Sequence, residues 1–187
     1  MRTRDFGLEY KIVHRNADNE VLYESEWEGN QVSDDGFEHM FDTYFCANAH
    51  NGNAPTSFVI GLLKQAPAAD GSDSYADLVQ VTNGTGAGDG YALQPLTRDA
   101  TGYVSILNSG GDTEITTAEV SFQNTDTDVG NVANVWDTAT HAFLAAVYTE
   151  GDGGHIFLSW KALSIARQIM PQDTLAVTIR QKGKLPE

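Results

Sequence analysis

Cysteine, basic residues and long apolar runs are all scarce in this sequence. Cys46 is the only cysteine among 187 residues, which excludes an intramolecular disulfide and a zinc site built from several cysteines. No apolar run approaches the ~20 residues that a membrane-spanning helix requires. The N-terminal stretch MRTRDFGLEY lacks the apolar core of a signal peptide. We therefore expect a protein that is not held in a membrane and is not exported by the Sec pathway.

The few basic residues lie mostly near the two ends of the chain. The net charge is −15, with 26 acidic and 11 basic residues, and between residues 16 and 160 only Lys64 and Arg98 are basic. A body of this charge repels phosphate groups, which argues against binding to nucleic acid. The basic ends either dock on an acidic partner or are simply solvated.

Alternation of apolar and polar residues with a period of two dominates the chain. Residues 6–15 and 21–28 alternate on either side of the turn-rich stretch NADNE, which predicts a β-hairpin. Further short runs of this kind follow between residues 57 and 181 and are separated by turn residues. The pattern predicts a mainly β protein, with an N-terminal hairpin arm at residues 1–28 and an antiparallel β-sandwich or jelly-roll-like domain at residues 29–187.

One segment, residues 34–47, has a helical period instead. Ser33 is a suitable N-cap, and two aspartates follow it in the first turn, where the helix dipole favours negative charge. The spacing of five apolar residues predicts one amphipathic helix whose apolar face packs on the body. These residues are Phe37, Met40, Phe41, Tyr44 and Phe45.

No catalytic residues and no cofactor site are predicted. The sequence contains neither an HExxH pattern nor a nucleophile elbow. The spacing of Asn124, Asp126 and Asp128 is similar to that of a calcium-binding loop, but the glycine falls one place late and the closing glutamate is missing, which favours an acidic turn over a weak calcium site. The three tryptophans, Trp27, Trp136 and Trp160, are interpreted as core or interface residues, with a sugar-stacking platform as the alternative.

The order of the segments resembles that of small structural proteins of tailed phages and related viruses. The stretch GNQVSDDGFEHMFDTYF resembles the opening N-x-V-T-x-x-G-L-x-H-L-L-D of that family. As in the family, SFVIGLL, DLVQVTNGTGAGDGYALQPL and AEVSF follow, and QDTLAVTI stands near the end. The match covers residues 29 to 182, although Gln172 replaces the glycine of the family's closing Gly-Asp pair.

The resemblance implies a virion structural protein that is not an enzyme and needs no cofactor. We expect a capsid decoration or cement protein, found in the virion and assembled in the host cytoplasm, with the major capsid protein or another virion protein as its partner. A tail-associated adaptor or fibre-associated protein is one alternative, and a carbohydrate-binding β-sandwich is another. A homo-oligomer is expected, and analogy with decoration proteins on local symmetry axes suggests a trimer.

The hairpin arm lies outside the resemblance and is the predicted contact with a partner. An isolated two-stranded hairpin needs another surface to be stable, and its strand edges offer unpaired backbone groups. We therefore expect the arm to reach a neighbouring copy or a capsid subunit. The candidate interface residues are the aromatic anchors Tyr10, Tyr23 and Trp27 and the basic residues Arg2, Arg4, Lys11 and Arg15.

Overall fold

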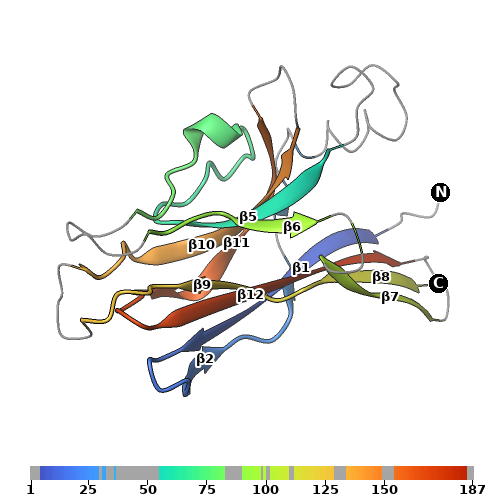
Figure 1. Ribbon diagram of the computed structural model, residues 1–187. Helices are drawn as coiled ribbons and strands as arrows, with labels where there is room; N and C mark the ends of the chain where they lie inside the picture. The colour runs from blue at the N-terminus through green and yellow to red at the C-terminus, as the bar shows by residue number, and fades with distance from the viewer. Residues whose placement is uncertain are drawn as a thin grey trace.

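The computed structural model shows a mainly β protein with two antiparallel sheets (Figure 1). It describes residues 5–29, 31–32, 36, 55–82, 90–97, 99, 102–109, 112–128, 134–148 and 154–184. The predicted helix at 34–47, its apolar stripe and Cys46 lie outside these residues, apart from Gly36, which is helical. Gly36 lies close to the backbone of Leu158, because a Cβ atom added at Gly36 would overlap the carbonyl group of Leu158.

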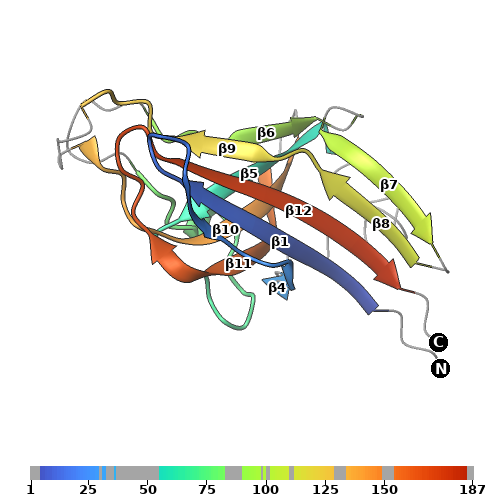
Figure 2. The same cartoon turned by 90° about the horizontal axis from the view of Figure 1, so that it is seen from below.

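The larger sheet contains seven strands. Its main path is β2 (Val21–Glu24), β1 (Asp5–Arg15), β12 (Thr174–Lys184), β8 (Asp112–Thr117) and β7 (Tyr103–Ser109). Two short strands are attached to this path: β3 (Glu28–Gly29) pairs with β1, and β9 (Val120–Gln123) pairs with β12. The first and last strands of the chain are therefore neighbours within one sheet, and Figure 2 shows them side by side.

The N-terminal strand is part of the body, and the prediction of a separate arm at residues 1–28 was wrong in this respect. β1 pairs with β12 along its whole length, from Asp5 opposite Lys184 to Arg15 opposite Thr174. Alternation along β1 places Leu8, Tyr10 and Ile12 in the main core. β1 and β2 do pair antiparallel across the turn at residues 16–20, and the second sheet supplies the surface that an isolated hairpin would lack.

The smaller sheet contains five strands. Its order is β4 (Gln31–Val32), β11 (His155–Arg167), β10 (Ala139–Val147), β5 (Ser57–Leu63) and β6 (Gln94–Thr97). The central strands β5 and β10 are almost continuously apolar, which is the expected pattern for strands that are buried on both faces.

The main core lies between the two sheets. On the larger sheet it takes alternate residues of β1 and β12, including Leu175, Val177 and Ile179, and on the smaller sheet it takes Ile60, Leu62 and alternate residues of β10. Tyr10 connects the sheets directly, because its hydroxyl group lies 2.9 Å from the Oγ atom of Ser159 on β11.

A second apolar cluster covers the other face of the smaller sheet. It contains Phe143, Phe157 and Trp160, and the rings of Phe157 and Trp160 are stacked with centroids 5.3 Å apart. The short 3-10 helix η2 (Tyr75–Asp77) packs against it through Tyr75. Gly61 lies opposite Phe143 in the sheet, and a Cβ atom there would overlap the Phe143 ring. Burial on both faces makes this sheet the most deeply enclosed part of the described chain.

Candidate interaction surface at the β2 edge

Strand β2 forms one edge of the larger sheet and exposes apolar side chains. Its pairing with β1 slips between Tyr23 and Val21, which leaves Leu22 bulged out of the ladder. Leu22 is 53% exposed, and its neighbour Val21 is also exposed. A bulge of this kind interrupts the regular backbone edge and is a common protection against strand pairing. The exposed feature at this edge is therefore its side chains and not its backbone.

The end of β11 bulges toward this edge from the other sheet. Arg167 pairs with Ala139 and Ala162 pairs with His141, so residues 163–166 face a single residue of β10. The bulge turns Ile165 outward, and its side chain is 60% exposed. Sequence alternation gave no indication of this bulge, because alternation places residues on faces but does not count the residues of the opposing strand.

Tyr23 connects β2 of the larger sheet to the bulge in β11 of the smaller sheet. Its hydroxyl group forms a hydrogen bond with Ser164. The guanidinium group of Arg167 lies over its ring, with Cζ 3.9 Å from the centroid, a geometry that gives a favourable cation–π interaction. Leu22 and Ile165 each lie next in sequence to a member of this contact. We define Val21, Leu22, Tyr23, Ser164 and Ile165 as the β2-edge surface.

A buried ionisable pair lies beneath this surface. The Nε2 atom of His14, at the end of β1, is 3.2 Å from the Oδ2 atom of Asp173, and both side chains are buried. Burial lowers the pKa of His14, Asp173 opposes that change, and the nearby Arg167 lowers the pKa further. The Nδ1 atom of His14 and the Nε and Nη2 atoms of Arg167 have no hydrogen-bond partner in the described part of the chain. Aromatic and charge contacts hold this end of the two sheets together, and three buried nitrogen atoms there have no hydrogen-bond partner among the described residues.

The structure separates the predicted interface residues into buried and accessible ones. Tyr10 is 1% exposed and belongs to the core, so its proposed role as a partner anchor was wrong. Tyr23 and Trp27 are half-buried. Arg2 and Arg4 lie outside the described residues.

The two predicted basic interface residues that the structure describes, Lys11 and Arg15, make contacts within the chain. The Nζ atom of Lys11 lies 2.6 Å from Glu24, and an Nη1 atom of Arg15 donates a hydrogen bond to the backbone carbonyl of Asn19. Trp27 is occupied as well, because Arg180 lies over its ring with Cζ 4.3 Å from the centroid.

Two basic residues of the C-terminal part, Lys161 and Arg180, also form ion pairs within the chain. Arg180 contacts Glu9 and Glu114 on the two strands that flank β12, and Lys161 lies 3.0 Å from Glu28. Since the first and last strands are neighbours, the acidic groups that neutralise these bases come from distant parts of the sequence. Their pairing reduces the positive potential that the basic ends offer to an acidic partner.

The calcium-like spacing at residues 124–128 has another physical origin. Asn124 is fully buried, and its Nδ2 group donates hydrogen bonds to the backbone carbonyls of Asn134 and Ile169. Its Oδ1 atom accepts the N–H of Asp126, and the Oδ1 atom of Asp126 accepts the N–H of Asp128. Consecutive Asx turns therefore explain the alternating pattern. No group of three His, Cys, Asp or Glu side chains is placed to hold a metal ion among the described residues.

The tryptophans do not form an exposed sugar-stacking platform. Trp136 belongs to the main core and Trp160 to the second cluster, and both are buried. Trp27 is half-buried beneath Arg180, as described above. These three tryptophans therefore do not provide the exposed aromatic surface on which the carbohydrate-binding alternative was based.

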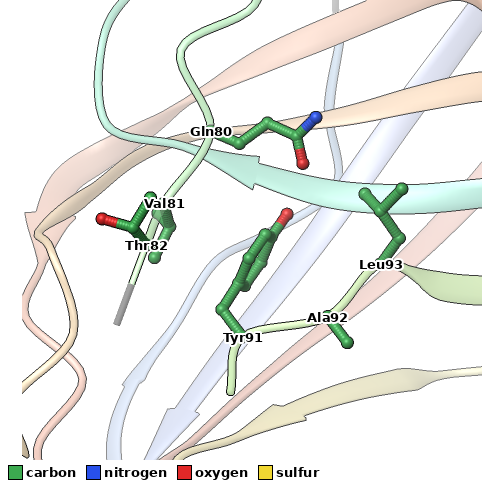
Figure 3. A pocket seen from close by; sticks show the side chains of 6 residues that line it. All are labelled: Gln80, Val81, Thr82, Tyr91, Ala92 and Leu93. Atoms are coloured by element: carbon green, nitrogen blue, oxygen red, sulfur yellow. The ribbon is translucent and has the colours of Figure 1, made fainter. Parts of the chain in front are cut away.

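An open hollow of about 440 Å³ lies beside the smaller sheet (Figure 3). It is lined by Gln80, Val81, Thr82, Tyr91, Ala92 and Leu93. The hydroxyl group of Tyr91 accepts a hydrogen bond of 2.7 Å from the backbone N–H of Leu62, and burial raises its pKa. Tyr91 also packs against Phe122 and Trp136. This tyrosine therefore supports β5 and the core.

Comparison with known proteins gives no match to a protein-family model, a curated protein or a solved structure. The fold defines a mainly β protein of two antiparallel sheets. Within the described residues, no helix is long and apolar enough to cross a membrane.

Proposed function

We propose that this chain is a non-enzymatic virion protein that decorates the capsid of a tailed virus and stabilises its shell. The observation that carries the proposal is the ordered resemblance over residues 29 to 182. SFVIGLL corresponds to β5, AEVSF includes the first residues of β9, and DTLAVTI covers the first part of β12. The motifs thus fall on both sheets, so the resemblance concerns the whole body and not one local segment.

The packing supports a mechanical role. We interpret the two sheets as a β-sandwich, because one continuous cluster takes side chains from both of them. Apolar clusters on both faces of the smaller sheet make it rigid. A rigid block that contacts two neighbouring capsid subunits adds buried area that the shell alone does not have. This is how a protein without a catalytic group would stabilise a shell.

The β2-edge surface is the proposed contact with the capsid. Its exposed apolar residues are Val21, Leu22 and Ile165. Among the side chains whose exposure the structure describes, they are three of the four large apolar ones that are exposed. The fourth, Val79, lies on a different part of the molecule, next to β5. Apolar side chains placed beside aromatic anchors are typical of the central part of a protein interface.

Electron microscopy of purified virus particles tests the location. Density for this chain on the outer surface of the shell supports decoration. Density only in the tail contradicts it and supports the alternative, a tail-associated adaptor or fibre-associated protein. Absence of the chain from purified particles would reject both virion roles.

A pair of surface variants tests the contact. Leu22→Ser with Ile165→Ser removes apolar area that is already exposed, so the free energy of unfolding should change by only about 0.5 kcal/mol per site. If these side chains become buried on the capsid, their loss costs about 2 kcal/mol and weakens binding to undecorated particles about 30-fold in a co-sedimentation assay. Val79→Ser is the matched control and should bind like the unaltered protein. Equal binding by all three proteins would place the contact elsewhere.

A further inference from the structure

The two sheets have several edge strands, and one of them differs from the others. β2, β6 and β9 have four residues each, and β3 and β4 have two. β2 carries the bulge at Leu22, and β6 contains Pro95, which cannot donate a backbone hydrogen bond. Short length, bulges and proline are the usual protections of a sheet edge against pairing with another chain.

Strand β7 lacks most of these protections. It has seven residues, YVSILNS, with no proline and no charged residue. Its pairing with β8 is irregular only at the start, between Tyr103 and Ser105, and is regular from Ser105 to Ser109. Within the described part of the chain β7 pairs only with β8 and ends the path of the larger sheet. In an antiparallel sheet every second residue of such a strand turns its N–H and C=O groups to the free side.

The free side of β7 is also accessible in space. The start of the strand is anchored to the smaller sheet, because Tyr103 packs edge-to-face on Phe58 of β5 with ring centroids 6.2 Å apart. From there β7 runs past the ends of β5 and β6 along the margin of the molecule, as both Figure 1 and Figure 2 show. None of the other described strands covers this margin.

We propose that two copies of the chain associate by pairing their β7 strands antiparallel, about a two-fold axis at Leu107. Ser105 of one copy then lies opposite Ser109 of the other, and Ile106 lies opposite Asn108. The larger sheets of the two copies become one continuous sheet. The pairing is isologous, as in most symmetric dimers.

Electrostatic repulsion opposes a second copy less at this edge than at a charged one. The chain carries a net charge of −15, so two copies repel each other wherever acidic groups face one another. The uncharged β7 provides a strip along which they can approach. The nearest charged strand is β8, and the two copies of β8 would be three strand spacings apart, about 14 Å, which exceeds the Debye length of ~8 Å at physiological salt. Glu114 on β8 is in addition partly neutralised by Arg180, at 3.8 Å.

Analytical ultracentrifugation of the purified full-length protein over a range of concentrations and salt tests the proposal. We expect a monomer–dimer equilibrium in which salt strengthens the dimer, because it screens the repulsion between acidic bodies. Ser105→Glu with Ser109→Glu places like charges directly opposite each other across the two-fold axis and should weaken the dimer at least tenfold. Ser121→Glu with Gln123→Glu adds the same charge at exposed positions of β9 and is the matched control.

A charge-swap mixture makes the test specific for β7. Ser105→Lys with Ser109→Lys alone should also be monomeric, whereas an equimolar mixture with the Glu variant should form a heterodimer. Circular dichroism and urea unfolding establish that each variant is folded. The proposal is overturned if the unaltered protein stays monomeric at high concentration and high salt, or if the β7 variants dimerise as well as the β9 control. It is likewise overturned if the mixture remains monomeric. The experiment uses no virus particles, so its outcome is independent of the proposed capsid role.

Discussion

Replacement of Tyr10 distinguishes a core residue from a partner anchor. Tyr10 lies on β1 and is 1% exposed, within the core between the two sheets. Its hydroxyl group forms a hydrogen bond with Ser159, which is itself fully buried on the opposite sheet. A residue that binds a partner affects the complex when it is removed, whereas a core residue affects the free energy of unfolding of the isolated chain.

The expected magnitude follows from these contacts. Tyr10→Ala removes a large aromatic side chain from the core and should cost about 3–5 kcal/mol, the range observed for buried aromatic residues. Tyr10→Phe keeps the ring but leaves the Ser159 hydroxyl group without this partner, and should cost about 1–3 kcal/mol. The two variants therefore separate ring packing from the hydrogen bond that links the sheets.

Urea unfolding followed by tryptophan fluorescence measures both effects. With a denaturant slope of about 2 kcal/mol per molar, a loss of 4 kcal/mol lowers the midpoint by about 2 M. Val21→Ala, at an exposed position on β2, serves as the control and should change the unfolding free energy by about 0.5 kcal/mol or less. If Tyr10→Ala unfolds within that same margin of the unaltered protein, the placement of β1 in the core is refuted.

Three further perturbations test separate parts of the structure. Gly61→Ala pushes a methyl group into the Phe143 ring and should lower the free energy of unfolding in urea by about 1–3 kcal/mol. Gly29→Ala is the control and should be near neutral, because there is open space around Gly29. Equal effects of the two substitutions would contradict the packing of Phe143. Asn124→Asp sets a carboxylate against two backbone carbonyls and should lower the free energy of unfolding by about 2–4 kcal/mol at neutral pH. A calcium site would instead bind calcium more tightly after this substitution. Recovery of the melting temperature on addition of calcium would therefore refute the Asx-turn explanation. Burial lowers the pKa of His14, so the neutral imidazole is favoured in the folded chain. As the pH falls below about 6.5, the unfolded chain takes up a proton first, and the free energy of unfolding decreases by up to about 1.4 kcal/mol per pH unit. His14→Gln should reduce this slope between pH 7 and pH 5 without removing it, because burial also lowers the pKa of His141 and of His155. An unchanged slope would show that His14 does not contribute to it.

The strands were largely predictable because alternation is a local property of the sequence. SFVIGLL corresponds to β5 residue by residue, and the run that begins at Thr174 is the start of β12. The mainly β class with antiparallel sheets followed from these runs and is confirmed. The partner of each strand was not predictable, because alternation says which face is buried but not which strand lies alongside. The pairing of β1 with β12, from opposite ends of the chain, could not be predicted, and it is the reason why the expectation of a separate N-terminal arm was wrong.

The side-chain sites were less predictable, for a similar reason. The spacing of Asn124, Asp126 and Asp128 fits both a calcium loop and consecutive Asx turns, and only the hydrogen-bond partners distinguish them. From the sequence, the basic residues near the ends could either dock on an acidic partner or be solvated. The fold brings acidic residues beside several of them, namely Glu9, Glu24, Glu28 and Glu114. Ion pairs between distant segments depend on register, which the order of charges along the chain does not contain.

The two edges of the larger sheet differ in ways that suit two different contacts. At the β2 edge the backbone ladder is interrupted, but apolar side chains are exposed, which favours a contact made through side chains. At the β7 edge the residues are uncharged and the ladder is regular from Ser105, which favours a contact made through the backbone. The path of the sheet places these edges at opposite ends. A copy bound to a capsid through β2 would therefore still have β7 free to pair with a second copy, and such a dimer would present two capsid-binding edges. Two linked contacts bind more tightly than either alone when both can be engaged together, so loss of the β7 pairing should also weaken attachment to particles, even though β7 itself would not touch the shell.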